Sequence, residues 1–281
     1  MTSYYMHIKK YLVRYKNLWI IIALILIIKI FSADSLTVER FYSTRFYFYF
    51  SKILRFLFGW VSFSVGDILY FIAGCWILFK LIKNIRLLFK KQLSRKIVLR
   101  KLYRIILLFG LIYIVFNIFW GLNYDRKGIA YQLKLTQLQY DTADLKMMQT
   151  ILLQKVNSTR MAVTRHHIFF PPQNEIIKKA IESYGKAQEK YPFLQYKNNS
   201  VKPSMYGLAG DYLGFTGYYN PFTGEAQINT TVPPFLQPYI ATHEMAHQLG
   251  YAKENEANFV GYLAAINSPD TLFHYSTYLD L

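Results

Sequence analysis

The chain has 281 residues, of which 53% are hydrophobic and 18% aromatic, and its formal net charge is +17. Four basic residues lie in residues 1–17 and ten in residues 80–104, with no acid in either block, whereas residues 123–281 hold 14 basic and 13 acidic residues. The net charge therefore comes almost entirely from two short blocks, and this distribution excludes a nucleic-acid-binding function for the nearly neutral part.

Three apolar runs, at about residues 18–33, 65–82 and 105–122, approach the roughly 20 residues that cross a bilayer as a helix. Basic residues concentrate on the cytosolic side of a membrane, and both basic blocks flank these runs. We therefore expect a multi-pass protein of the cell membrane, with a cytoplasmic amino terminus and with residues 123–281 in an extracytoplasmic domain. The alternative for the first run is a cleaved signal peptide, although a good cleavage site does not follow it.

A further apolar stretch, at about residues 41–60, is rich in aromatic residues and contains Lys52 and Arg55. Each charge near the centre of a bilayer costs roughly 2.5–3.5 kcal/mol on insertion scales. We therefore expect an interfacial aromatic helix that lies on the outer membrane surface. If residues 46–65 spanned instead, the two basic blocks would lie on opposite sides and the carboxy-terminal domain would be cytosolic.

The domain at residues 123–281 is predicted to be mainly α with a small β-hairpin (α+β). The turn sequence NPFTG at residues 220–224 separates two short runs that favour strands. The predicted elements are helices at residues 141–160 and 174–190 and strands at residues 215–219 and 225–229. His166 and His167 lie between the helices, and adjacent residues seldom bind one metal from one helix face. Because Cys75 is the only cysteine, no disulfide forms within the chain.

The sequence His243-Glu244-Met245-Ala246-His247 follows the hairpin. Two histidines four residues apart project from one face of a helix and can bind a single zinc ion. In such HExxH sites the glutamate after the first histidine is the general base for water that the metal activates. Glu244 is therefore the predicted catalytic residue, and the competing interpretation is a pair of structural histidines on a helix face.

A zinc site with two imidazoles needs a third, anionic ligand and an open position. Gly250 is a predicted helix cap, so the chain can turn there and begin a second helix near Lys253. Glu254 and Glu256 are the carboxylates that this turn brings close, and a tight helical hairpin would place Glu256 more nearly level with the histidines. The residues alone leave both open.

The motif resembles that of the gluzincin zinc peptidases, in which a glutamate on the helix after HExxH is the third ligand. In those enzymes an Asp or Asn four residues later braces a histidine, and Glu254 with Asn258 fits that spacing. The resemblance implies a zincin-like domain in which His243, His247 and Glu254 bind Zn²⁺.

Tyr218, Tyr219 and His274 are the candidates for stabilising the oxyanion that forms when water attacks a carbonyl. The hairpin that contains both tyrosines could offer an edge strand to an extended peptide substrate. The competing interpretation is that the hairpin only covers the core.

Three segments, PFTGEA at residues 221–226, HEMAHQLG at residues 243–250 and ENEANF at residues 254–259, resemble an uncharacterised family of bacterial membrane proteins. These proteins have three membrane helices and an HExxH domain that is catalogued as a domain of unknown function. Members of this family continue for several more helices beyond the segment that corresponds to the end of this chain. The resemblance therefore implies a carboxy-terminally truncated domain. The predicted function is a membrane-anchored zinc metallopeptidase acting on an unknown peptide or protein; the alternative is a non-catalytic, zinc-stabilised binding or envelope-sensing domain.

Overall fold

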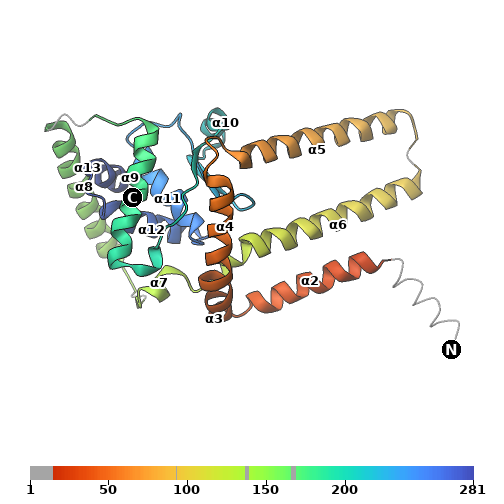
Figure 1. Cartoon of the computed structure of the whole chain (residues 1–281), viewed down its shortest axis with the longest axis horizontal. Coiled ribbons are helices and arrows are strands. Elements are labelled where there is room, and N and C mark those ends of the chain that lie inside the picture. Colours follow the sequence, from red (N-terminus) through yellow and green to blue (C-terminus); the bar gives the residue numbers. More distant parts are fainter. Residues whose placement is uncertain (1–14, 93, 137–138, 166–168) are drawn as a thin grey trace.

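The structure, a computed structural model, describes residues 15–92, 94–136, 139–165 and 169–281. It is mostly helical with a small sheet of three strands, as the sequence predicts. Three long helices extend in one direction from a body of shorter helices (Figure 1). These long helices are α2 (Lys16–Ser32), α5 (Val65–Phe89) and α6 (Arg95–Phe119). His166 and His167 lie outside the described residues.

Within the described residues, α5 and α6 are each long and apolar enough to cross a membrane. Helix α2 has 17 residues and meets the same criterion only together with its bent continuation, Ser35–Gly59. The chain therefore has two candidate spans, or three if the bent pair is one span. Helix α2 packs along α6, where the methyl group of Ile21 occupies the place of a side chain at Gly110.

Helices α5 and α6 both extend into the basic residues between the second and third apolar runs, α5 to Phe89 and α6 from Arg95, and α6 ends at Phe119, three residues before the predicted end. Helix α6 begins at Arg95 rather than near residue 105, because the Ser94 hydroxyl caps it by accepting a hydrogen bond from Ile97 N–H at 3.4 Å. Lys and Arg are good helix formers, so the basic residues before the apolar run continue the helix without a break. Hydropathy locates the apolar part of such a helix but not its ends.

The chain turns by 91° after α2 into three short helices that follow one another closely. The Asp34 carboxylate starts this turn by accepting hydrogen bonds from the N–H groups of Leu36 and Thr37. The helices are α3 (Ser35–Thr37), the π-helix η1 (Val38–Phe46) and α4 (Tyr47–Gly59). They cover the aromatic stretch predicted at residues 41–60, and α4 runs across the bases of the long helices (Figure 1).

The sheet has the strand order β1-β3-β2, with β1 at Val201–Pro203, β2 at Gly217–Asn220 and β3 at Glu225–Ile228. Strands β2 and β3 form the predicted antiparallel hairpin, in which Gly217 is opposite Ile228 and Asn220 is opposite Glu225. Strand β1 pairs in parallel with β3 and is absent from the sequence-based prediction, because three residues that end in proline give no strand pattern. Strand β2 is an edge strand.

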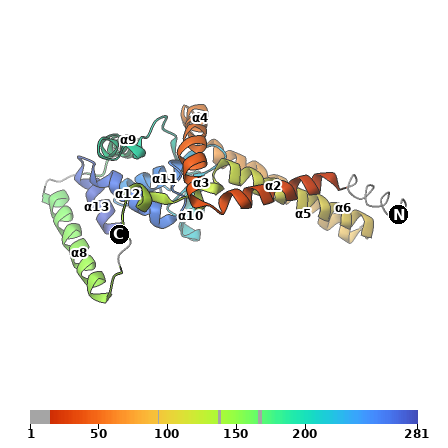
Figure 2. The same ribbon diagram turned by 90° about the horizontal axis from the view of Figure 1, so that it is seen from below.

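The core of the body surrounds α11 (Gln237–Gln248), which packs against β3, α9 (Gln173–Lys190) and α12 (Glu254–Ile266). Small side chains on α11 and α12 let these two helices approach closely, among them Ala241, Ala246, Ala257 and Ala264, all fully buried. Helix α13 (Thr271–Asp280) packs on α11 and α12, and α8 (Thr142–Arg165) packs on α13 (Figure 2). The remaining short helices are η2 (Gly121–Asp125), α7 (Gly128–Gln132), η3 (Pro192–Leu194) and α10 (Gly207–Leu213).

Candidate metal centre

Helix α11 brings His243 and His247 together on one face. Pro238 lies in the first turn of this helix, where its missing N–H breaks no helical hydrogen bond. The two imidazole rings are 4.8 Å apart between centroids. The four-residue spacing thus brings both imidazoles to one face of the helix, as the sequence predicts.

Gly250 ends α11 and turns the chain back toward it. Its φ of +87° is left-handed, a conformation that glycine adopts without steric cost. Gly250 N–H donates to His247 O at 2.9 Å, and Tyr251 N–H donates to Ala246 O at 3.2 Å. These two bonds form a Schellman cap, so the predicted turn at Gly250 is confirmed.

Glu254, the first residue of α12, meets both histidines. Its carboxylate oxygens lie 3.3 Å from His243 Nε2 and 3.6 Å from His247 Nε2, and one ligand atom from each residue lies within 4.8 Å of the others. Gly261 makes the close approach of α12 to α11 possible, because a Cβ at this position would lie only 3.1 Å from the N and Cα atoms of His243. The three residues that the gluzincin resemblance implies therefore converge on one point.

Glu256 points elsewhere. Its carboxylate fills the space beside Gly128, where an added Cβ would lie 2.0 Å from Oε1. Burial raises the pKa of this carboxyl, although Lys253 and Arg126 partly offset the effect. The residues alone left the choice between these two carboxylates open. In the structure Glu254 lies with the histidines and Glu256 does not.

His247 has a fixed partner behind it. His247 Nδ1 lies 2.7 Å from Tyr251 O, and since a carbonyl can only accept, Nδ1 carries the proton and Nε2 keeps its lone pair toward Glu254. A fixed outer partner of this kind orients an imidazole for metal binding. Asn258, the residue that the gluzincin spacing implies, contributes to the raised pKa of His243.

Glu244 is 4% exposed, and within the described residues its Oε2 has no hydrogen-bond partner. Burial raises the pKa of Glu244, and the nearby His247 and His243 partly oppose this effect. The pKa of Glu254 is lowered because its carboxylate lies beside the imidazoles of His243 and His247. Burial by itself would lower the pKa of His243, but the bond to Glu254 and the charge of Glu244 raise it. Two carboxyl groups in one site thus have pKa values moved in opposite directions.

A cavity of about 330 Å³ opens over these residues. Strand β2 and the loop before it form one wall, and the face of α11 that carries His243 and His247 forms the other. Trp120, the C-cap residue of α6, also lines the cavity, with its ring 6.0 Å from that of His247. The lining residues are Trp120, Gly214, Phe215, Thr216, Gly217, Tyr218, Tyr219, His243, Glu244, His247 and Glu254.

Tyr218 and Tyr219 line the cavity, but both hydroxyl groups already have partners. Tyr218 O–H donates to the buried Asp67 carboxylate at 2.5 Å, and the Tyr219 hydroxyl lies 3.0 Å from that of Tyr47. Burial raises the pKa of Tyr219 to about 12. His274 is absent from the described lining and bonds Ser268 O instead, so the structure does not bring it to the cavity.

Sequence reasoning did not find the residues near the long helices that contact this site. Trp120 Nε1–H donates to His247 O at 3.3 Å, and Asp67 in the first turn of α5 accepts from Tyr218. One signal was available: Asp34, Glu39 and Asp67 are the only acidic residues before Asn123. Glu39 and Asp67 are 4% and 1% exposed, and an acidic residue buried in such a region needs a partner.

Comparison with known proteins gives a family for this arrangement. No curated protein and no solved structure matches the chain. A family model described as "Protein of unknown function (DUF3810)" matches residues 42–281, which include α4 and both candidate spans as well as the cavity. The chain therefore belongs to the DUF3810 family, an uncharacterised family, as the resemblance of its three marker segments implied.

Proposed function

We propose that the chain is a membrane-anchored zinc metallopeptidase with a zincin-like domain. The observation that carries the proposal is the convergence of His243, His247 and Glu254 beside the buried, unpartnered carboxylate of Glu244. Two imidazoles and one carboxylate with an open position form a donor set that zinc takes in hydrolases. Glu256 Oε2 is likewise buried without a partner, but only Glu244 lines the cavity beside the histidines.

Zinc held by these three side chains would supply a Lewis acid that activates water and polarises a carbonyl. Glu244 would accept the proton of the attacking water and deliver it to the leaving amine. Its burial supports this role, because a carboxyl group with a raised pKa is closer to the working pH of a general base.

Strand β2 is suited to orient a peptide. It is one of the two edge strands of the sheet, and Gly217, Tyr218 and Tyr219 on it line the cavity. An extended peptide could add to this edge and lie across the face of His243 and Glu244. Because Trp120, at the end of the candidate span α6, lines the cavity, the substrates best placed to reach it are peptide segments close to the membrane surface.

Metal analysis of the purified chain tests the ligand set. We expect about one zinc per chain for the wild type, as in catalytic sites with three protein ligands. Glu254→Gln removes a ligand and should weaken zinc binding by more than the about 10- to 100-fold typical of outer partners. Glu256→Gln and His274→Ala are matched controls, since neither side chain joins the ligand group, and both should keep the metal. Loss of zinc from Glu256→Gln but not from Glu254→Gln would contradict the assignment.

The position of the basic turn between α5 and α6 supports a cavity that faces away from the cytoplasm. The turn between α5 and α6, with Lys90 and Lys91, lies at the end of the molecule opposite the cavity (Figure 1), and basic turns stay in the cytosol. In a Cys75→Ser background, Tyr212→Cys should react with a membrane-impermeant maleimide on intact cells, since Tyr212 is 92% exposed. Gln92→Cys should react only after permeabilisation. The reverse pattern would place the cavity in the cytosol.

A further inference from the structure

We infer that Arg126, held by Glu39, positions His247 for metal binding, so that the segment after the first long helix completes the metal centre. The inference rests on the proposed metal site but not on the peptidase activity. Arg126 is a positioning residue, because it contacts neither a ligand nor the cavity and acts through the turn at Gly250 and Tyr251.

The end of α11 depends on donors from the region of the long helices. The last carbonyl groups of a helix lack partners within it and need donors from elsewhere. Here the Schellman cap at Gly250 supplies two of these donors. Further donors come from residues 47–126. The bonds are Trp120 Nε1 to His247 O (3.3 Å), Arg55 Nη1 and Tyr47 OH to Gln248 O (2.9 and 3.1 Å), and Arg126 Nη1 to Gly250 O (3.0 Å).

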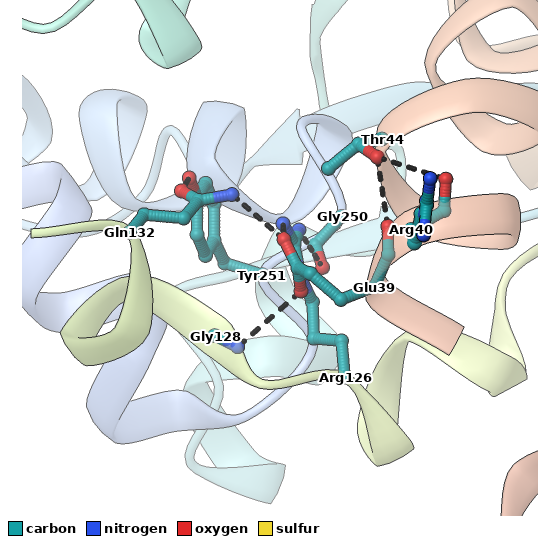
Figure 3. A network of polar contacts seen from close by, with 8 residues as sticks. All are labelled: Glu39, Arg40, Thr44, Arg126, Gly128, Gln132, Gly250 and Tyr251. Carbon is teal, nitrogen blue, oxygen red and sulfur yellow. Dashed lines mark hydrogen bonds and ion pairs between the residues drawn. The ribbon is translucent and has the colours of Figure 1, made fainter. Parts of the chain in front are cut away.

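Arg126 itself is fixed by Glu39 of η1 (Figure 3). Two parallel hydrogen bonds join them, from Nε to Oε2 at 2.9 Å and from Nη2 to Oε1 at 2.7 Å. Both residues are 4% exposed, and Gln132 Nε2 donates to the same carboxylate at 2.9 Å. A two-bond pair of this kind sets the plane of the guanidinium as well as its distance.

The fixed guanidinium in turn holds Tyr251. It lies 4.7 Å over the Tyr251 ring while it donates to Gly250 O, and the Tyr251 hydroxyl donates to Gln132 Oε1 at 2.5 Å. Figure 3 shows Tyr251 together with Arg126 and Gln132, the two side chains that hydrogen-bond Glu39. The carbonyl of Tyr251 accepts the Nδ1 proton of His247. The group that sets the tautomer of His247 is therefore held by the Glu39–Arg126 pair.

Geometry, rather than stability, accounts for a charged pair at this place. A buried ion pair adds little net stability compared with well-packed apolar side chains of similar size. Its advantage is a fixed orientation, and outer partners of metal-binding histidines change metal affinity by about 10- to 100-fold. The pair connects η1 to the turn after α11. A shift of η1 relative to the body would therefore move Arg126 and, through that turn, the ring of His247.

The test uses the full-length chain in detergent. The double variant Glu39→Gln/Arg126→Met removes both charges and leaves no buried charge unpaired, while Arg126→Lys keeps the charge and loses the two-bond geometry. Lys179→Met is the control, because it breaks the pair with Asp270 between α9 and the start of α13, away from the cavity. The measurements are Zn²⁺ affinity by chelator competition, the visible spectrum of the Co²⁺ form, and the ¹⁵N shifts of His247 in the metal-free chain.

We expect both variants to bind Zn²⁺ more weakly, by about 10- to 100-fold for the double variant, with an altered Co²⁺ spectrum. Lys179→Met should keep the wild-type affinity and spectrum. A lower melting temperature with unchanged Zn²⁺ affinity and spectrum would overturn the inference and leave the metal site intact. If the double variant does not fold, Arg126→Lys decides by the same criteria.

The ¹⁵N shifts separate this inference from the proposed metal site. If the wild type binds no Zn²⁺, the proposed metal site fails, and the tautomer of His247 still tests the role of Arg126. We expect a proton on Nδ1 in the wild type and a mixture of tautomers in both variants. A wild-type tautomer that persists in both variants would overturn the inference.

Discussion

Replacement of Glu244 by glutamine is expected to lower kcat for peptide hydrolysis by about 10²- to 10⁴-fold, the range for a positioned general base, while the chain keeps its zinc. Glutamine has nearly the same volume but cannot accept the proton of the attacking water. Glu244 lines the cavity and lies outside the ligand group of His243, His247 and Glu254, so metal binding should survive. The measurement is kcat on a peptide substrate, with zinc content determined on the same preparation.

Glu256→Gln is the matched control for this substitution. Glu256 is also a partly buried glutamate with a raised pKa near the end of α11, but its carboxylate lies against Gly128 and not in the cavity. We expect its activity to stay close to that of the wild type. Zinc-loaded Glu244→Gln protein that hydrolyses peptides as fast as the wild type would remove Glu244 from the mechanism. Zinc binding without hydrolysis in the wild type as well as in both variants would favour the binding or sensing function.

Local sequence signals were sufficient for the histidine pair and for the turn that follows it. The spacing of His243 and His247 fixes their common face once the segment is a helix. Gly250 gives the left-handed residue that a Schellman cap requires, and the cap determines where α12 can begin. Both features depend on residues within one or two helical turns, which is the range over which a sequence pattern is informative.

The choice between Glu254 and Glu256 was beyond local reasoning. The two residues lie two apart on α12, so the packing of that helix on α11 decides which one faces the histidines. Gly261, where α12 passes the His243 backbone, and Gly128, where α7 receives the Glu256 carboxylate, settle that packing. No local sequence pattern predicts that Gly261 lies against His243 or that Gly128 lies against Glu256, because each contact joins distant parts of the chain.

The contacts of the long-helix region with the site were missed for a related reason. Hydropathy predicts an interfacial helix at residues 41–60, in which the charge of Arg55 opposes a membrane-spanning position. In the structure Arg55 is 1% exposed and donates to Gln248 O at the end of α11. A basic residue in an apolar helix can satisfy its charge against protein carbonyls, and the sequence contains no sign of which carbonyls these are.

Gly217→Ala is expected to lower kcat/KM by about 10²-fold, because displacement of a catalytic group by about 1 Å has an effect of that size. A Cβ at this position would lie 2.6 Å from Glu244 Oε1 and 2.9 Å from the backbone oxygen of Gln227. Either Glu244 must move or β2 must shift away from β3, and an overlap of this kind costs roughly 1–3 kcal/mol. The measurement is kcat/KM together with zinc content, which should stay at the wild-type level because no ligand is touched.

Gly185→Ala separates this effect from the general effect of replacing glycine. Gly185 lies inside α9 with nothing within 4 Å of an added Cβ, so alanine there should stabilise the helix by about 0.5–1 kcal/mol and leave hydrolysis unchanged. If Gly217→Ala has full activity, the close contact of β2 with Glu244 does not affect catalysis, and the strand serves only to cover the core. If the variant loses activity and keeps its zinc, the close approach of β2 to Glu244 is part of how this cavity holds its base.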